Sequence, residues 1–227
     1  LAPRELAAAW RHGFTGVPGS GMVHATSMLA PLRRHDRLNN PSEQTVVTIH
    51  DALPWTHPAL LPARTVSWRR GMAKRAERYA DAVVVPTHAA AADLAEHLAF
   101  GDRIRVIGGA PADDLVTPAD AAERRKRLGL PDRFVLAVAE GEARNGFLDL
   151  LAAWSLPHVD DVDLVIIADS SSAAELGAKT GGRIHVLKSP SAADLAATFD
   201  GAAVFVSPLT SAGSDASLVD AFAFGLP

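Results

Sequence analysis

Residues 82–98 read AVVVPTHAAAADLAEHL, in which a short apolar run directly precedes a helix-forming stretch. The run Ala82–Val85 is rich in valine and carries no charge, as is typical of a strand buried on both faces of a parallel sheet. Thr87 then stands where it can cap a helix expected over Ala89–Leu98. Repeated along a chain, this strand-and-helix unit predicts an α/β protein.

The same alternation continues over the whole length of 227 residues. The predicted strands are Val46–Ile49, Ala82–Val85, Ile104–Ile107, Phe134–Val138, Leu164–Ile167, Ile184–Leu187 and Ala203–Val206. The predicted helices are Ser67–Tyr79, Ala89–Leu98, Ala119–Leu128, Phe147–Trp154, Ala192–Phe199 and Ser217–Phe224. A stretch rich in proline and aspartate, residues 108–118, interrupts this rhythm, so we place a domain boundary there. We expect two Rossmann-like lobes facing a cleft, an N-terminal lobe over 1–117 and a C-terminal lobe over 118–227.

The composition excludes several classes of function. The chain has 22 Lys and Arg against 26 Asp and Glu, a net charge of -4, so its overall field does not attract nucleic acid. The absence of cysteine excludes disulfides and thiolate metal sites, and no HExxH, GxxxxGK[ST] or GxSxG motif occurs, so no metal is expected. The chain has neither a long apolar run nor a signal peptide, which favours a cytoplasmic protein. It begins without Met and stops just after an apolar helix-like run, so we expect both lobes to be incomplete.

Ligands of open α/β sheets bind beyond the carboxyl ends of the strands, where this chain carries its densest polar cluster. His50 and Asp51 follow the strand Val46–Ile49, and Trp55 lies close behind them. The imidazole can accept a proton or bind a sugar hydroxyl, and the indole offers a flat apolar face. In the alternative interpretation, His50 and Asp51 only fix a loop whose shape the neighbouring prolines set. Thr87 similarly follows a strand, with a plain helix cap as its alternative role.

The order of the segments resembles a known family. VVTIHDALPWTHP, ADAVVVPTHAAAADLAEHL, RIRVIGGA, RFVLAVAEGEARNGFLDLLAAW and ATFDGAAVFVSPLTSAGSDASLVDAFAFGLP are together similar to family 4-type retaining glycosyltransferases of the GT-B fold, from about His24 to Pro227. The resemblance implies two Rossmann-like lobes, with a nucleotide-sugar donor held mainly by the C-terminal one. It places His50 and Asp51 over the reaction centre, with Trp55 and Thr87 on the acceptor side. It implies no cofactor and no required metal.

The basic donor motif departs from the family pattern. The family reads approximately Gly-Thr-x-Glu-Pro-Arg-Lys-Asn, whereas the matching stretch here is AEGEARNG, residues 139–146. Arg144 keeps its place, but Asn145 stands where the diphosphate-binding lysine is expected. Lys188, which follows a predicted strand, is a candidate replacement cation, with a solvated surface lysine as the alternative interpretation.

The acidic donor motif departs as well. The family carries two glutamates with seven positions between them, and here Ala212 stands at the first position and Asp220 at the second. Gly213, Ser214 and Asp215 match the Gly-Phe-Gly turn between them. Asp220 is a candidate for the nucleoside end of the donor, and Asp215 for the lost carboxylate.

Two hypotheses follow. In the first, the protein moves a hexose, mannose being one candidate, from a GDP- or UDP-linked sugar to a glycan or lipid-linked acceptor with retention, as in polysaccharide biosynthesis. In the second, it is a catalytically impaired homologue that binds or stabilises an active partner, because the expected lysine and both glutamates are missing. The basic residues between Arg69 and Arg78 are a solvated helix face, with peripheral contact to anionic lipid at the inner face of the membrane as the alternative. No nucleic-acid partner is expected.

Overall fold

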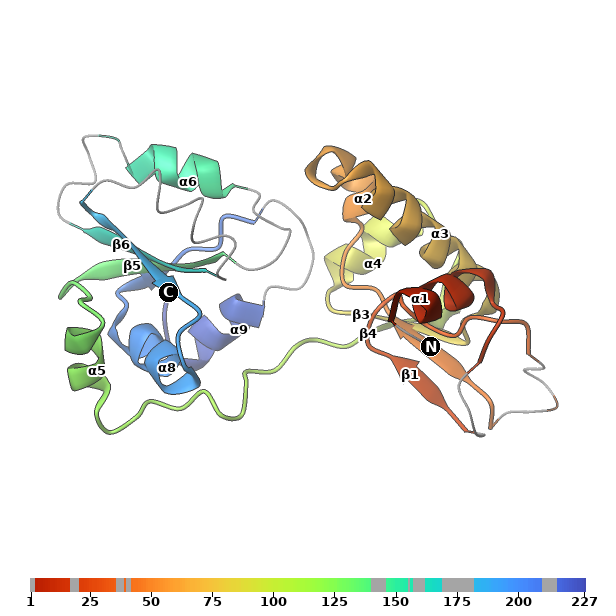
Figure 1. The fold of residues 1–227 in the computed structure, drawn as a ribbon, viewed down its shortest axis with the longest axis horizontal. Coiled ribbons are helices and arrows are strands. Elements are labelled where there is room, and N and C mark those ends of the chain that lie inside the picture. Colours follow the sequence, from red (N-terminus) through yellow and green to blue (C-terminus); the bar gives the residue numbers. More distant parts are fainter. Residues whose placement is uncertain are drawn as a thin grey trace. The chain divides into compact units, whose positions relative to one another are not determined.

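The computed structural model describes residues 3–16, 21–35, 39, 42–139, 146–154, 156, 162–168, 182–209 and 216–227. The chain divides into two compact units, the first extending to Gly108 and the second starting at Gly109 (Figure 1). Each unit is built on its own four-stranded parallel sheet with helices packed against it. The predicted α/β class with two Rossmann-like lobes is therefore confirmed.

The first unit has the strand order β1-β2-β3-β4, with all neighbours parallel. Its strands are β1 (Val23–Ala25), β2 (Thr45–Thr48), β3 (Ala82–Val85) and β4 (Ile104–Val106). Its helices are α1 (Pro3–His12), α2 (Leu53–Thr56), α3 (Ala63–Tyr79) and α4 (His88–Ala95), with short 3-10 turns η1 (Pro58–Leu60) and η2 (Gly101–Arg103).

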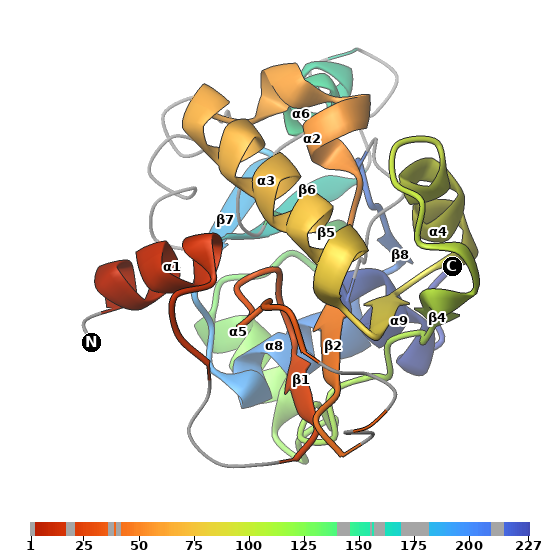
Figure 2. The same cartoon turned by 90° about the vertical axis from the view of Figure 1, so that its right-hand side faces the viewer.

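The core of the first unit lies between its sheet and two helices. Val47 of β2 and Val83 of β3 are fully buried and share a register. Met72 of α3 and Leu94 of α4 belong to the same apolar cluster. Figure 2 shows α3 as the long helix of this unit, running alongside the sheet. Burial of these apolar side chains stabilises the packing of the helices on the sheet, and the sheet in turn positions the loops at its carboxyl edge.

The second unit has the strand order β7-β6-β5-β8, again parallel throughout. Its strands are β5 (Phe134–Ala139), β6 (Asp163–Ala168), β7 (Ile184–Lys188) and β8 (Val204–Phe205). Its helices are α5 (Ala121–Arg127), α6 (Phe147–Trp154), α8 (Ala192–Gly201) and α9 (Ala216–Ala223). In Figure 1, α6 covers one face of this sheet, and α8 and α9 lie on the other.

This sheet is apolar on both faces, because alternate residues of each strand point to opposite sides. Ala137 of β5 and Ile166 of β6 pack with Phe147 of α6. Leu136 and its neighbours face the other way, toward Phe199 of α8. Phe199 is 1% exposed and stacks on Phe205 and Phe224 at centroid distances of 5.9 and 5.5 Å. The near-continuous apolar strands of the sequence are thus explained by burial on two sides.

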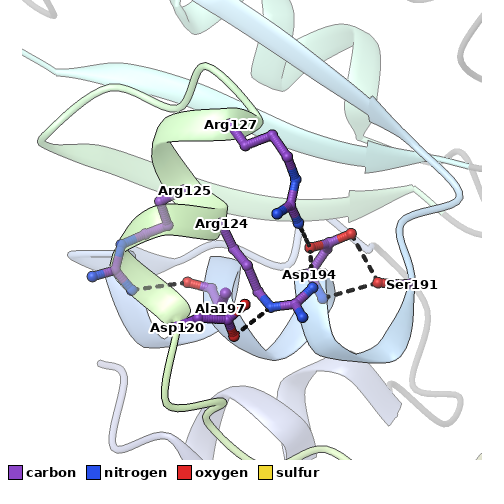
Figure 3. A network of polar contacts seen from close by, with 7 residues as sticks. All are labelled: Asp120, Arg124, Arg125, Arg127, Ser191, Asp194 and Ala197. Carbon is purple, nitrogen blue, oxygen red and sulfur yellow. Dashed lines mark hydrogen bonds and ion pairs between the residues drawn. The ribbon is translucent and has the colours of Figure 1, made fainter.

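An ion-pair network joins α5 to α8 (Figure 3). Arg124 donates to Asp120 at 2.7 Å and to Asp194 at 2.8 Å, and Arg127 donates to Asp194 at 3.0 Å. Asp194 also accepts a 2.8 Å hydrogen bond from Ser191, the N-cap residue of α8. Hydrogen bonding to Arg124, and then to Ser191, holds the pKa of the Asp194 carboxyl below its ordinary value. The arginines of α5 therefore bind carboxylates of α8 and hold the two helices together.

All predicted strands are found, and their ends differ from the prediction by one residue at most. The strand Ala82–Val85 and the helix Phe147–Trp154 are correct to the residue. Three elements of the first unit were not predicted: α1, β1 and α2. Helix α3 begins at Ala63, four residues before the predicted Ser67, and Pro62 is its N-cap residue.

Candidate functional site

The carboxyl edge of the first sheet gathers side chains that follow three neighbouring strands. Thr26 follows β1, His50 follows β2 and Thr87 follows β3, and these strands are adjacent in the sheet. Parallel pairing places their ends at one edge, so the sequence prediction of a polar strand-end cluster has a structural basis.

His50 is exposed at this edge and has a defined ring orientation. Its Nε2 lies 2.9 Å from the carbonyl oxygen of Thr26. A carbonyl only accepts hydrogen bonds, so Nε2 carries the proton of the neutral ring and Nδ1 carries the lone pair. Nδ1 has no protein partner within the described ranges, and it is therefore the atom of His50 that can accept a proton from a ligand.

The Asp51 carboxylate is engaged on both oxygens. Oδ1 accepts from the backbone N–H of Leu53 at 2.9 Å, and Oδ2 accepts from the guanidinium of Arg69 at 2.8 Å. The side chains of Asp51 and Arg69 are only 14% and 16% exposed. These contacts tie the start of α2 to α3 and favour the interpretation in which Asp51 fixes the loop. Arg69 has no sequence signal for this role, because it stands 18 positions after its partner.

Trp55 and Thr87 have clear local contacts. The indole of Trp55 stacks on the ring of His97 with centroids 5.6 Å apart and packs partly against the core of the first unit. The Thr87 hydroxyl accepts from the backbone N–H of Ala90 at 3.0 Å, which confirms the predicted N-cap of α4. Their predicted contact with an acceptor stays a prediction.

A hollow of about 590 Å³ lies beyond this segment, between η1 and the first turns of α3. Its lining is mainly apolar, with one hydroxyl and one guanidinium: Pro58, Ala59, Leu61, Ala63, Val66, Ser67 and Arg70. The Arg70 guanidinium already donates to the carbonyl oxygen of Pro54 through Nε and Nη2, at 3.0 and 2.6 Å. The hollow therefore offers an apolar wall, and its Arg70 contacts α2.

In the second unit, a close backbone approach joins two segments at the carboxyl edge of the sheet. Gly146 directly precedes α6 and has φ +83°, a conformation that favours glycine, and a Cβ built there would overlap the carbonyl oxygen of Pro208. Gly146 ends the connection that begins after β5, and Pro208 follows β8, the neighbour of β5. Gly146 and Pro208, one described residue from each stretch predicted to carry a donor motif, therefore lie next to each other. The sequence signal for this glycine is its position just before an apolar helix.

Two predicted donor residues fall in the described part of this unit. Lys188 is exposed at the carboxyl end of β7, in register with Ala168 of β6, which is in register with Ala139 at the end of β5. Two strand spacings separate the ends of β7 and β5, about 10 Å. Asp220 of α9 accepts a 3.2 Å hydrogen bond from the backbone N–H of Ala112. Five other predicted donor residues lie outside the described residues: Arg144, Asn145, Gly213, Ser214 and Asp215.

The basic residues of α3 are mostly engaged within the first unit. Arg69 and Arg70 bind Asp51 and the carbonyl of Pro54. Lys74 donates to Glu77 and to the carbonyl of His97, and Arg75 donates to the carbonyl of Leu32 at 2.6 Å. These contacts give no support to a lipid-binding role for the four cations.

Within the described residues, no group of three or more His, Asp or Glu side chains is placed to hold a metal ion. Nor do they include a helix with the length and apolar character needed to cross a membrane.

Neither a scan against protein-family models nor a search of curated proteins gives a match. Solved structures do match. Sucrose-phosphate synthase from Thermosynechococcus elongatus has a TM-score of 0.67 and 19% identity, covering 91% of this chain and 55% of that one. Anabaena HepE in complex with UDP-glucose has a TM-score of 0.59 and 19% identity, covering 82% and 52%. WaaG, a glycosyltransferase involved in lipopolysaccharide biosynthesis, has a TM-score of 0.57 and 14% identity, covering 99% and 75%.

These likenesses establish the fold. The two parallel sheets with their helices are the Rossmann-like units of the GT-B fold, as the sequence predicted. The chain spans about half the length of the first two structures. At such low identity, substrate and reaction have to be argued from the residues of this chain.

Proposed function

We propose that this chain belongs to a glycosyltransferase that moves a hexose from a nucleotide-diphosphate sugar to a glycan or lipid-linked acceptor with retention. UDP and GDP are the candidate nucleotides, and glucose and mannose the candidate sugars. The observation that carries the proposal is the meeting of the Gly146 and Pro208 segments at the carboxyl edge of the second sheet. These are the stretches in which the sequence carries its candidate donor-binding residues, and open α/β sheets bind nucleotides at this edge.

The proposed donor site uses cations against the diphosphate. Arg144 lies in the connection that ends at Gly146, and Lys188 stands at the same edge of the same sheet. A guanidinium and an ammonium there would offset the missing family lysine, with the guanidinium forming paired hydrogen bonds to phosphate oxygens. HepE, a protein of the same fold, binds UDP-glucose. Asp220 stays the candidate for the nucleoside end.

The proposed acceptor side lies in the first unit. His50 presents Nδ1 at the strand edge and can accept a hydrogen bond from a sugar hydroxyl. The apolar hollow beyond η1 supports an acceptor with an apolar portion, such as a lipid-linked glycan. A cytoplasmic location fits a nucleotide-sugar donor and is part of the proposal.

Titration calorimetry with UDP and GDP tests the donor site. Arg144→Gln is expected to weaken nucleotide binding roughly tenfold to a hundredfold, the effect of losing hydrogen bonds to a charged group. Arg133→Gln is the matched control, because Arg133 is exposed at the amino end of β5, away from the carboxyl edge. Absence of binding for both nucleotides at millimolar concentration, or equal losses in the two variants, would contradict the donor site.

Release of nucleotide from UDP-glucose and GDP-mannose tests the reaction. His50→Ala is expected to lower the transfer rate by about 10² or more while nucleotide affinity is kept. His57→Ala, at an exposed histidine just after α2, is the control and should leave the rate unchanged. Nucleotide binding without turnover on any acceptor would refute transfer and match an impaired homologue instead. Proton NMR of the product distinguishes retention from inversion.

A further inference from the structure

A second polar hollow lies in the first unit, away from the proposed reaction centre. It has a volume of about 310 Å³ and is lined by Arg34, His35, Arg78 and Tyr79. Two guanidiniums, one imidazole and one phenol make up this lining, with no carboxylate among the described residues that form it. The volume is at the lower end of the range for small-molecule sites.

The hollow lies at the amino edge of the sheet. His35 Nε2 is 2.7 Å from Oδ2 of Asp81, and the same oxygen accepts from the backbone N–H of Thr45 at 2.7 Å. Thr45 begins β2 and Asp81 directly precedes β3. His50 lies five residues after Thr45, at the other end of β2, which corresponds to about 16 Å. The proposed reaction does not use these residues.

His35 is fixed in place by its contacts. Its side chain is 9% exposed, its Nδ1 lies 3.1 Å from the carbonyl oxygen of Arg33, and its Nε2 faces Asp81. Both ring nitrogens thus face oxygen atoms, and these contacts hold the ring in one orientation. Glu77, one position before Arg78, is turned to the backbone N–H of Ala99 and to Lys74. The described lining therefore carries two guanidiniums and no carboxylate.

The two arginines supply the binding groups. Arg34 is exposed and has no hydrogen bond or ion pair in the part of the chain that the structure describes. Arg78 lies over the ring of Tyr79, 5.3 Å from its centroid, and Arg75 lies 4.9 Å from the same centroid. Stacking on this ring limits the freedom of the arginines and orients guanidinium groups beside the hollow. An oriented guanidinium matches the oxygens of a phosphoryl group.

We propose that this hollow binds a small anion that carries a phosphoryl group, at a site separate from the proposed donor and acceptor sites. Arg34 and Arg78 hold the phosphoryl oxygens, His35 forms part of the floor, and Tyr79 lies against the remainder of the ligand. The ligand is either a free phosphorylated small molecule or the phosphate of a lipid headgroup. Both present the same group to the two arginines.

Inorganic phosphate is the probe, titrated up to about 10 mM into the full chain at constant ionic strength, with chloride as the reference anion. Calorimetry and the melting temperature are expected to report saturable binding that stabilises the protein. Arg34→Gln is expected to weaken it roughly tenfold to a hundredfold. Because Arg34 has no contact to lose in the described structure, this variant should melt at the wild-type temperature without phosphate. Arg64→Gln, at an exposed arginine of the same unit, is the matched control and should bind as wild type.

The outcomes separate this site from the donor site. Phosphate binding that survives Arg34→Gln but is lost in Arg144→Gln places the anion in the second unit and overturns the proposal. No saturable binding to the wild type, or the same loss in Arg34→Gln and Arg64→Gln, overturns it as well. Sedimentation with phosphatidylglycerol vesicles, compared with neutral phosphatidylcholine vesicles, identifies the source. If the wild type binds the anionic vesicles and Arg34→Gln does not, the ligand is a lipid headgroup. If the wild type binds free phosphate but not the vesicles, the ligand is a soluble molecule.

Discussion

Replacing Asp51 with alanine tests whether this residue stabilises the protein or takes part in chemistry. The substitution removes two hydrogen bonds to a carboxylate, from the Leu53 backbone N–H at 2.9 Å and from Arg69 at 2.8 Å. A hydrogen bond to a charged group contributes about 1.5–3 kcal/mol. The Arg69 side chain keeps 16% of its surface exposed, so water solvates part of the charge left behind. We expect Asp51→Ala to lower the free energy of unfolding by about 2–4 kcal/mol, or roughly 5–15 °C in melting temperature.

Urea unfolding followed by tryptophan fluorescence measures this loss, because Trp10, Trp55 and Trp68 all lie in the first unit. A double-mutant cycle with Arg69→Met isolates the ion pair and is expected to give a coupling energy of about 1–2 kcal/mol. Asp102→Ala, at an exposed aspartate of the same unit, is the control and should stay within about 0.5 kcal/mol of wild type. If Asp51→Ala is as stable as the wild type but loses transfer activity, the structural role is refuted and a role of Asp51 in the reaction is supported.

Three further predictions concern the second unit. Phe199→Ala should lower its unfolding free energy by about 3–5 kcal/mol in urea titrations, since this side chain is 1% exposed between two other rings, and a loss below 1 kcal/mol would contradict the packing. Gly146→Ala should reduce both stability and nucleotide affinity, because the new Cβ overlaps the Pro208 carbonyl, and calorimetry giving wild-type affinity would speak against the contact. Because folding lowers the pKa of Asp194, its ionised carboxylate should stabilise the protein at pH values above 3.8, the ordinary pKa of aspartate. This stabilisation should be lost as the pH falls through the lowered pKa. In the Asp194→Asn variant, the melting temperature should therefore fall less steeply at acidic pH than in the wild type. An equally steep fall in both proteins would exclude this contribution.

The fold could be predicted because burial on both faces of a parallel sheet leaves a strong signal in the sequence. Uninterrupted apolar runs such as Phe134–Val138 are typical of these strands. β1 was not predicted because it has only three residues and the middle one, His24, is polar. The strand accommodates this histidine because its Nε2 lies 2.9 Å from the Thr48 hydroxyl and forms a hydrogen bond with it. Helix α2 is a single turn, too short for a periodic pattern.

The candidate site could be predicted only in part. The rule that ligands bind at strand ends located His50, and local cap chemistry located the role of Thr87. The partner of Asp51 could not be found, since contacts between residues 18 positions apart on different elements follow from tertiary packing and leave no spacing pattern. The same holds for the amino-edge hollow, which joins Arg34 to Arg78 from distant parts of the chain.

The contact between Gly146 and Pro208 also limits how this protein can vary. A side chain at position 146 is compatible only with a different backbone path at position 208, so natural or engineered changes in one loop require matching changes in the other. Grafting the first loop from a relative into this scaffold should therefore fail unless the second is transplanted with it. The two positions therefore have to be changed together, although 62 positions of sequence separate them.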